Sequence, residues 1–145
     1  MQSVEILAAG TWNSSTATEH FIATWKDRFL RRGPLQLASG KRVLLELEKT
    51  IFLHDGDALK LKNDMIIGVR SQPEYLRRIT TSTPDGQQGI VAYLQKQKRP
   101  FLISPTGMIV RAVDISEPQL AIFNASSEEI VAPFNVPALP EHYAA

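Results

Sequence analysis

The chain has 145 residues, of which 43% are hydrophobic, 21% charged and 8% aromatic, a composition typical of folded globular proteins rather than disordered chains. Sixteen basic and fifteen acidic side chains give a formal charge of +1, so the overall field favours neither nucleic acid nor an anionic membrane as a partner. The chain contains no cysteine, which excludes disulfides, thiolate metal sites and cysteine nucleophiles.

No stretch of the sequence is apolar for long enough to span a bilayer. The segment from Met1 to Gly10 lacks the basic start and the long apolar run of a signal peptide. We therefore expect a soluble cytoplasmic protein with no membrane partner and no nucleic-acid partner.

Short strands alternate with turns in the first half of the chain. The patterns predict strands at 4–7, 20–25, 35–37, 43–47, 51–53, 58–61 and 65–69. The turn at 38–41 joins two of them into a hairpin, and Asp55-Gly56 reverses the chain because Gly56 tolerates a positive φ. With no helical pattern among them, these strands favour a small antiparallel barrel or sandwich.

A charged segment runs from Lys26 to Arg32 and is interrupted by two apolar residues. It has two interpretations. It is either a solvated connection or a basic surface that meets an acidic partner. In the second case Arg28, Arg31 and Arg32 are the candidate partner-binding residues.

Pro73 predicts a boundary, because the residue before a proline is displaced from helical geometry and the pattern changes beyond it. The second half then predicts strands at 74–79, 101–103, 108–113 and 128–132. One amphipathic helix contains residues 90–94 and ends before Pro100, with Ser82 or Asp85 as its cap. A second, shorter helix begins with a capping box at Ser116 and Gln119 and ends at 124.

This order of elements, βαββαβ, is the ferredoxin-like arrangement, in which both helices pack on one face of an antiparallel sheet. The sequence therefore predicts an α+β protein. We expect a β-rich domain at 1–72, a ferredoxin-like domain at 73–136 and a flexible tail at 137–145.

Few residues indicate chemistry. The three histidines lie far apart, and none has a second histidine at metal-ligand spacing. His20 and His54 are interpreted as ordinary imidazoles, whereas His142, on the tail, is the candidate metal ligand. The pair Asp55 and Asp57 is interpreted as turn chemistry. There is no nucleophile elbow, Walker A loop or dinucleotide-binding glycine motif, so we expect a protein that is not an enzyme.

Several short motifs follow one another along the chain: Arg31-Arg32, the 53–59 turn, Pro73-Glu74, the helix segment 91–94 with Pro100 after it, and 132–134. In this order they resemble the UreE-type urease accessory proteins, which are nickel metallochaperones. The resemblance implies an N-terminal domain that binds partner protein and a ferredoxin-like domain that dimerises and binds nickel. It also implies three kinds of partner: a second copy of the chain, urease apoprotein and other urease accessory proteins.

The chain departs from that family at the end of the longer helix. The family usually has a Leu-Gly-Asn-Arg-His-x-Pro run there, whose histidine shares nickel across the dimer axis, and this chain has Lys98 at that position. A protonated lysine has no lone pair for a metal, and two of them across an axis repel each other. Some members add histidines on the following strand, where the segment 111–114 offers only a carboxylate.

Three hypotheses remain open at this point. The chain is a urease-assembly metallochaperone whose nickel site is weakened or has moved, with His142 and carboxylates as ligands. Alternatively, it is a metal-independent dimeric adaptor in that assembly or elsewhere. In the third case, a β domain and a ferredoxin-like domain are joined for an unrelated task.

Overall fold

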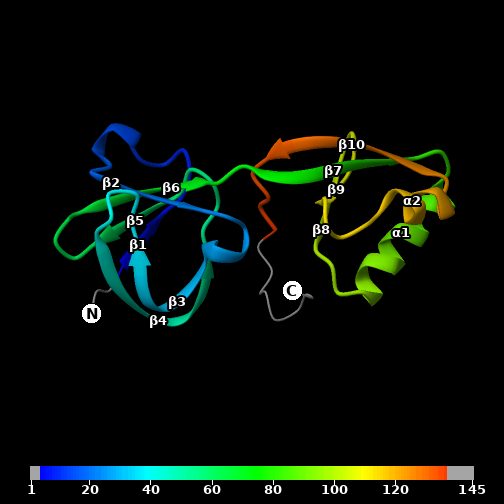
Figure 1. Ribbon diagram of the computed structural model, residues 1–145. Helices are drawn as coiled ribbons and strands as arrows, with labels where there is room; N and C mark the ends of the chain where they lie inside the picture. The colour runs from blue at the N-terminus through cyan, green and yellow to red at the C-terminus, as the bar shows by residue number, and fades with distance from the viewer. Residues whose placement is uncertain (1–3, 137–145) are drawn as a thin grey trace. The chain divides into compact units, whose positions relative to one another are not determined.

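The computed structural model of the protein describes residues 4–136. Contacts group them into two compact units, one running to Gln72 and the other from Pro73 to Val136. Within the described range, both α-helices belong to the second unit, and both units contain β-sheet (Figure 1). This confirms the predicted α+β class. No helix of the described range is long and apolar enough to cross a membrane.

The first unit contains two sheets. Four strands pair in the order β1-β5-β6-β2, and β3 pairs with β4 as a separate hairpin (Figure 1). All of these pairs are antiparallel except β2 with β6. The elements are β1 (Val4–Leu7), η1 (Ser14–Thr16), β2 (Glu19–Ala23), η2 (Lys26–Arg28), β3 (Phe29–Gln36), β4 (Arg42–Phe52), β5 (Ala58–Leu61) and β6 (Ile66–Ser71).

The core of this unit lies between the two sheets. Burial alternates along β2, which places Phe21 and Ala23 in the core, and Ile67 and Val69 of β6 join them there with residues of the β3–β4 hairpin. Burying each large apolar side chain contributes roughly 1.5–3 kcal/mol. The predicted hairpin about 38–41 is confirmed, but its first strand begins earlier, inside the charged segment.

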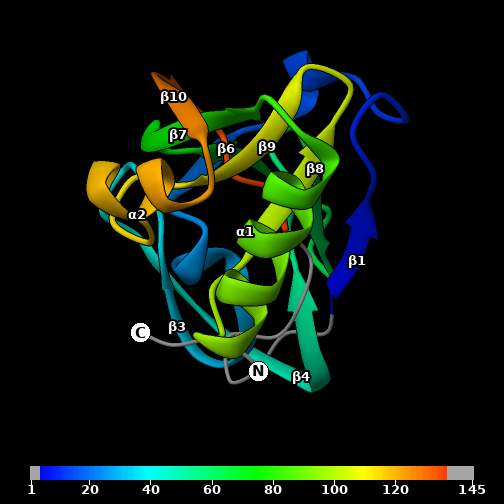
Figure 2. The same cartoon turned by 90° about the vertical axis from the view of Figure 1, so that its right-hand side faces the viewer.

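The second unit has the predicted ferredoxin-like order. Its elements are β7 (Glu74–Thr81), α1 (Pro84–Lys96), β8 (Phe101–Ser104), β9 (Gly107–Arg111), α2 (Glu117–Ile122) and β10 (Ala125–Ala132). The strands form one antiparallel sheet in the order β10-β7-β9-β8. Ile79, Met108 and Val110 of the sheet share a core with residues of both helices, so α1 and α2 cover the same face (Figure 2).

The ends of several elements differ from the sequence prediction. The cap of α1 is Thr83, whose hydroxyl accepts a hydrogen bond from the Gly86 backbone N–H at 3.1 Å; the expected caps, Ser82 and Asp85, were wrong. The capping box of α2, with Ser116 and Gln119, is confirmed. Strand β10 begins three residues earlier than predicted, because residues 125–127 already pair with the end of β7.

Candidate functional site

The end of α1 is where the resemblance places a metal ligand. The Lys98 N–H donates to the Gln95 carbonyl at 3.1 Å, and the Arg99 N–H donates to the Leu94 carbonyl at 2.8 Å. These two bonds form a Schellman motif, whose C′ residue adopts a left-handed conformation, and Lys98 has a φ of 54°. Its side chain is exposed, at the helix end where the dipole favours positive charge.

The turn after β9 places the buried carboxylate of Asp114 next to Arg99, the residue that follows Lys98. The Asp114 side chain is 0% exposed. Arg111 binds it with two hydrogen bonds, Nε to Oδ2 at 2.7 Å and Nη2 to Oδ1 at 3.0 Å. Arg99 adds a third, Nη1 to Oδ1 at 3.2 Å. Both carboxylate oxygens therefore already accept charge-assisted hydrogen bonds from guanidinium groups.

These residues do not fit a nickel site. The end of α1 and the turn after β9 carry three cationic side chains, Lys98, Arg99 and Arg111, and one carboxylate, Asp114. This excess of positive charge repels a metal cation. The ammonium of Lys98 has no lone pair to donate. Residues 4–136 contain no group of three histidine or acidic side chains that could hold a metal ion.

The fold separates the three candidate partner-binding arginines, Arg28, Arg31 and Arg32. Arg28 is 0% exposed, with its Nη1 3.3 Å from the Leu53 carbonyl and its guanidinium 5.1 Å from the centre of the Phe52 ring. Arg31 and Arg32 are exposed on β3. Of the three candidate residues, only Arg31 and Arg32 are therefore at the surface, and their role in partner binding stays a prediction.

The two histidines in the described part of the chain, His20 and His54, lie on different segments of the first unit. His142 lies outside the described residues. His54 is half exposed, with its Nδ1 3.6 Å from an Asp57 oxygen. His20 lies on β2 beside Gly68. Neither of the two described histidines belongs to a set of potential metal ligands.

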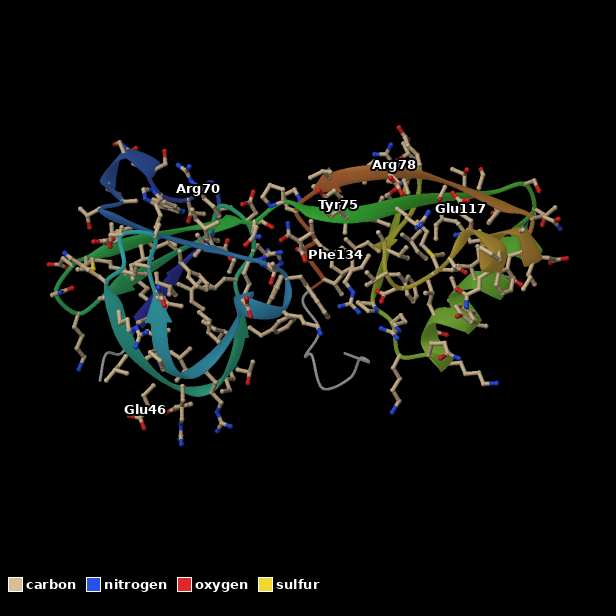
Figure 3. All side chains as sticks on the ribbon, viewed as in Figure 1. Glu46, Arg70, Tyr75, Arg78, Glu117 and Phe134 are labelled. Atoms are coloured by element: carbon tan, nitrogen blue, oxygen red, sulfur yellow. The ribbon has the colours of Figure 1, made fainter. Side chains whose placement is uncertain are left out.

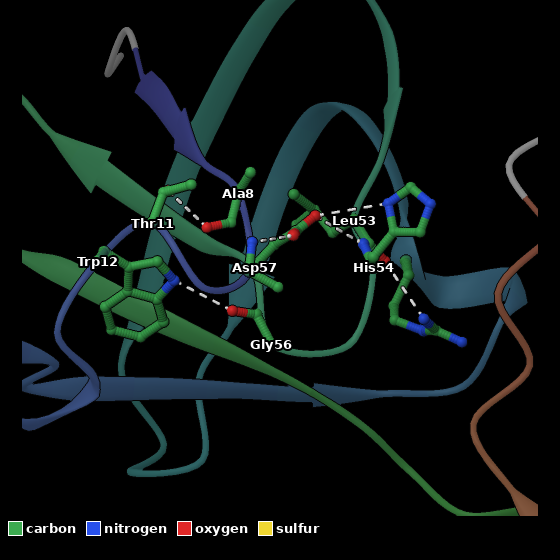
Figure 4. Close-up of polar contacts among 9 residues, drawn as sticks. Ala8, Thr11, Trp12, Leu53, His54, Gly56 and Asp57 are labelled. Carbon is green, nitrogen blue, oxygen red and sulfur yellow. Dashed lines mark hydrogen bonds and ion pairs between the residues drawn. The ribbon is translucent and has the colours of Figure 1, made fainter.

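The Asp-Gly turn between β4 and β5 holds three segments of the first unit together (Figure 4). Asp57 is 6% exposed, and its carboxylate accepts hydrogen bonds from the backbone N–H groups of His54 at 2.8 Å and Ala9 at 2.9 Å. The Gly56 carbonyl, in a residue with φ of 89°, accepts the Trp12 indole N–H at 3.0 Å. The acidic pair of this turn is therefore structural.

The first unit matches a known family. The model for the N-terminal domain of the UreE urease accessory protein matches residues 4–72, a range that ends where the first compact unit ends. The first unit is therefore a UreE-type N-terminal domain. Its Asp-Gly turn and its Arg31-Arg32 pair lie inside the matched range.

Similarity to UreE proteins continues through the second unit. The urease accessory protein UreE of Beijerinckia indica is 28% identical over 134 residues, which is 92% of this chain and 77% of that protein. The UreE of Rhodopseudomonas palustris is 29% identical over 136 residues, 89% of this chain and 64% of that protein. The UreE of Rhodobacter capsulatus is 29% identical over 129 residues, which is 89% of this chain and 79% of that protein.

Sequence patterns do not reveal the burial of two carboxylates in this chain. From the sequence alone, Asp114 is an available carboxylate and Asp57 an ordinary turn residue. A weak signal existed for Asp114, since Arg111 precedes it by three residues, the spacing of a turn that can close an ion pair. For Asp57 the local sequence accounts for one partner only: His54 is three residues away, whereas Ala9 is 48 residues away.

Proposed function

We propose that this protein is a dimeric urease accessory chaperone that assists nickel delivery during urease maturation in the cytoplasm. Similarity to UreE proteins across both compact units is the observation that carries the proposal. In it, the unit at 1–72 binds partner protein and the unit at 73–136 dimerises. The partners are urease apoprotein and the other urease accessory proteins, and the role is not catalytic.

The nickel site of this chaperone is weakened or moved away from the end of α1. Lys98 cannot coordinate a metal, and Asp114 is engaged by two arginines. The remaining candidate ligand is His142, acting with carboxylates. A moved site of this kind requires that nickel binding depend on the tail and not on the end of α1.

A metal-independent dimeric adaptor is the second candidate. The observation that favours it is the positively charged end of α1, where Arg99 and Arg111 both hold Asp114. An adaptor of this kind needs the partner surfaces and the dimer, but not the metal.

Nickel titration of the purified full-length chain distinguishes the two candidates. The chaperone proposal predicts a stoichiometric site of micromolar or tighter affinity, which is lost in His142→Ala and kept in the matched control His54→Ala. Absence of such a site, together with retained binding of urease apoprotein, selects the adaptor. A monomeric mass combined with no binding of urease apoprotein contradicts both.

A further inference from the structure

The outer face of the β2–β6 pair is the feature that the proposed function leaves unexplained. In this parallel pair His20 lies opposite Gly68, and Ile22 lies opposite Arg70. Successive side chains of a strand point to opposite faces, and the alternate residues of both strands fill the core. His20, Ile22 and Arg70 therefore share the outer face, and Ile22 is 51% exposed.

The Trp12 ring packs over part of this face, above Gly68. A Cβ atom at Gly68 would lie 3.4 Å from the Trp12 ring and 3.3 Å from the His20 ring, so glycine permits the close approach of both. The indole N–H of Trp12 is fixed by the Gly56 carbonyl (Figure 4). A hollow of about 370 Å³ lies here, with Trp12, His20, Gly68 and Arg70 among its lining residues.

Two charged side chains line the hollow, Arg70 and Asp55. Arg70, labelled in Figure 3, is exposed, and no carboxylate of residues 4–136 forms an ion pair with it. Asp55 also lines the hollow, but its Oδ1 accepts the Ser71 N–H at 2.6 Å. One oxygen of Asp55 is thus engaged by the backbone of β6, and Arg70 is the cation in this lining with which a ligand carboxylate can pair, beside the aromatic surface of Trp12.

We propose that this face, formed by Trp12, His20, Ile22 and Arg70, docks a protein segment that presents a carboxylate next to an apolar side chain. The apolar side chain enters the hollow against Trp12, and the carboxylate pairs with the Arg70 guanidinium. Tryptophan and arginine dominate binding energy at protein interfaces. The inference rests on the proposed function, because it identifies a face on which the first unit meets a partner protein.

The two tryptophans provide the test. Trp12 lies on the proposed face, whereas Trp25 is 1% exposed, so their two indole N–H resonances in a ¹H–¹⁵N spectrum report on the face and on the buried interior. The full chain is titrated with a capped peptide of alternating aspartate and leucine, and with an asparagine–leucine peptide of the same length. We expect the Trp12 signal to move with the acidic peptide, and the Trp25 signal to stay.

Charge reversal tests the role of Arg70. Arg70→Glu is expected to weaken binding of the acidic peptide at least about tenfold, since it removes a charge-assisted pair. The matched control Lys62→Glu changes an exposed cation on the β5–β6 turn and is expected to change affinity less than about twofold. The proposal is overturned by an unmoved Trp12 signal, by equal binding of the asparagine–leucine peptide, or by equal effects of the two variants.

A second readout separates this inference from the proposed function. If urease apoprotein binds the wild type and Arg70→Glu equally, the face is not the docking site, although the urease role stands. If urease apoprotein binds neither chain while the acidic peptide still moves the Trp12 signal, the face binds acidic segments and the urease role is wrong.

Discussion

Asp114→Ala is expected to lower the free energy of unfolding by about 3–5 kcal/mol, the range for removing one partner of a buried ion pair. The Asp114 side chain is 0% exposed and that of Arg111 10% exposed, so the variant leaves the Arg111 guanidinium in a poorly solvated place without this carboxylate. It also releases Arg99, and with it the link between the end of α1 and the turn after β9. Urea unfolding of the full chain followed by circular dichroism measures the loss.

The control for this variant is an exposed pair in the same unit. Glu128 accepts from Arg78 at 3.2 Å, but its side chain is 70% exposed. Glu128→Ala is therefore expected to cost less than about 1 kcal/mol. Equal losses for Asp114→Ala and Glu128→Ala contradict the burial and bidentate geometry of the Asp114 ion pair.

Asp57→Ala is expected to lower the free energy of unfolding by about 3 kcal/mol, because two backbone N–H groups each lose a charged acceptor. These groups belong to His54 and Ala9, so the variant also loosens the segment that leads from β1 to Trp12. Asp57→Asn keeps one acceptor oxygen and is expected to cost less than alanine does. Fluorescence of the two tryptophans during urea unfolding reports on this unit.

Asp27→Ala is the matched control for the Asp57 variant. Asp27 is exposed, and its one hydrogen bond to a side chain, from the Thr24 hydroxyl, is 3.4 Å long. We expect Asp27→Ala to change stability by less than about 0.5 kcal/mol. If Asp57→Ala costs no more than Asp27→Ala, the turn does not hold the β1 segment in the way described.

Local patterns predicted most of the fold because they depend on neighbouring residues. Alternating apolar residues placed β5 at 58–61, and the serine–glutamine spacing placed the start of α2. The direction of β2 against β6 was not predictable from local pattern. Alternation indicates which face of a strand is buried, but it carries no information on which strand pairs beside it or in which direction.

The site was harder to predict because its side chains are set by residues far apart in the sequence. Arg28 looked like a surface charge, but its guanidinium meets a carbonyl 25 residues away, at Leu53. The lysine at position 98 was visible in the sequence; the two arginines that occupy Asp114 were not. That contact depends on how α1 and β9 end in three dimensions.

Nickel titration of Lys98 variants tests the central claim, which is that the end of α1 in this chain cannot hold a metal. The account predicts that wild type and Lys98→Ala bind nickel identically. Lys98→His is expected to add one nickel ion per dimer, because it restores an imidazole with a free lone pair. Weaker nickel binding by Lys98→Ala than by wild type would contradict the account, since it would show that the metal is held at Lys98.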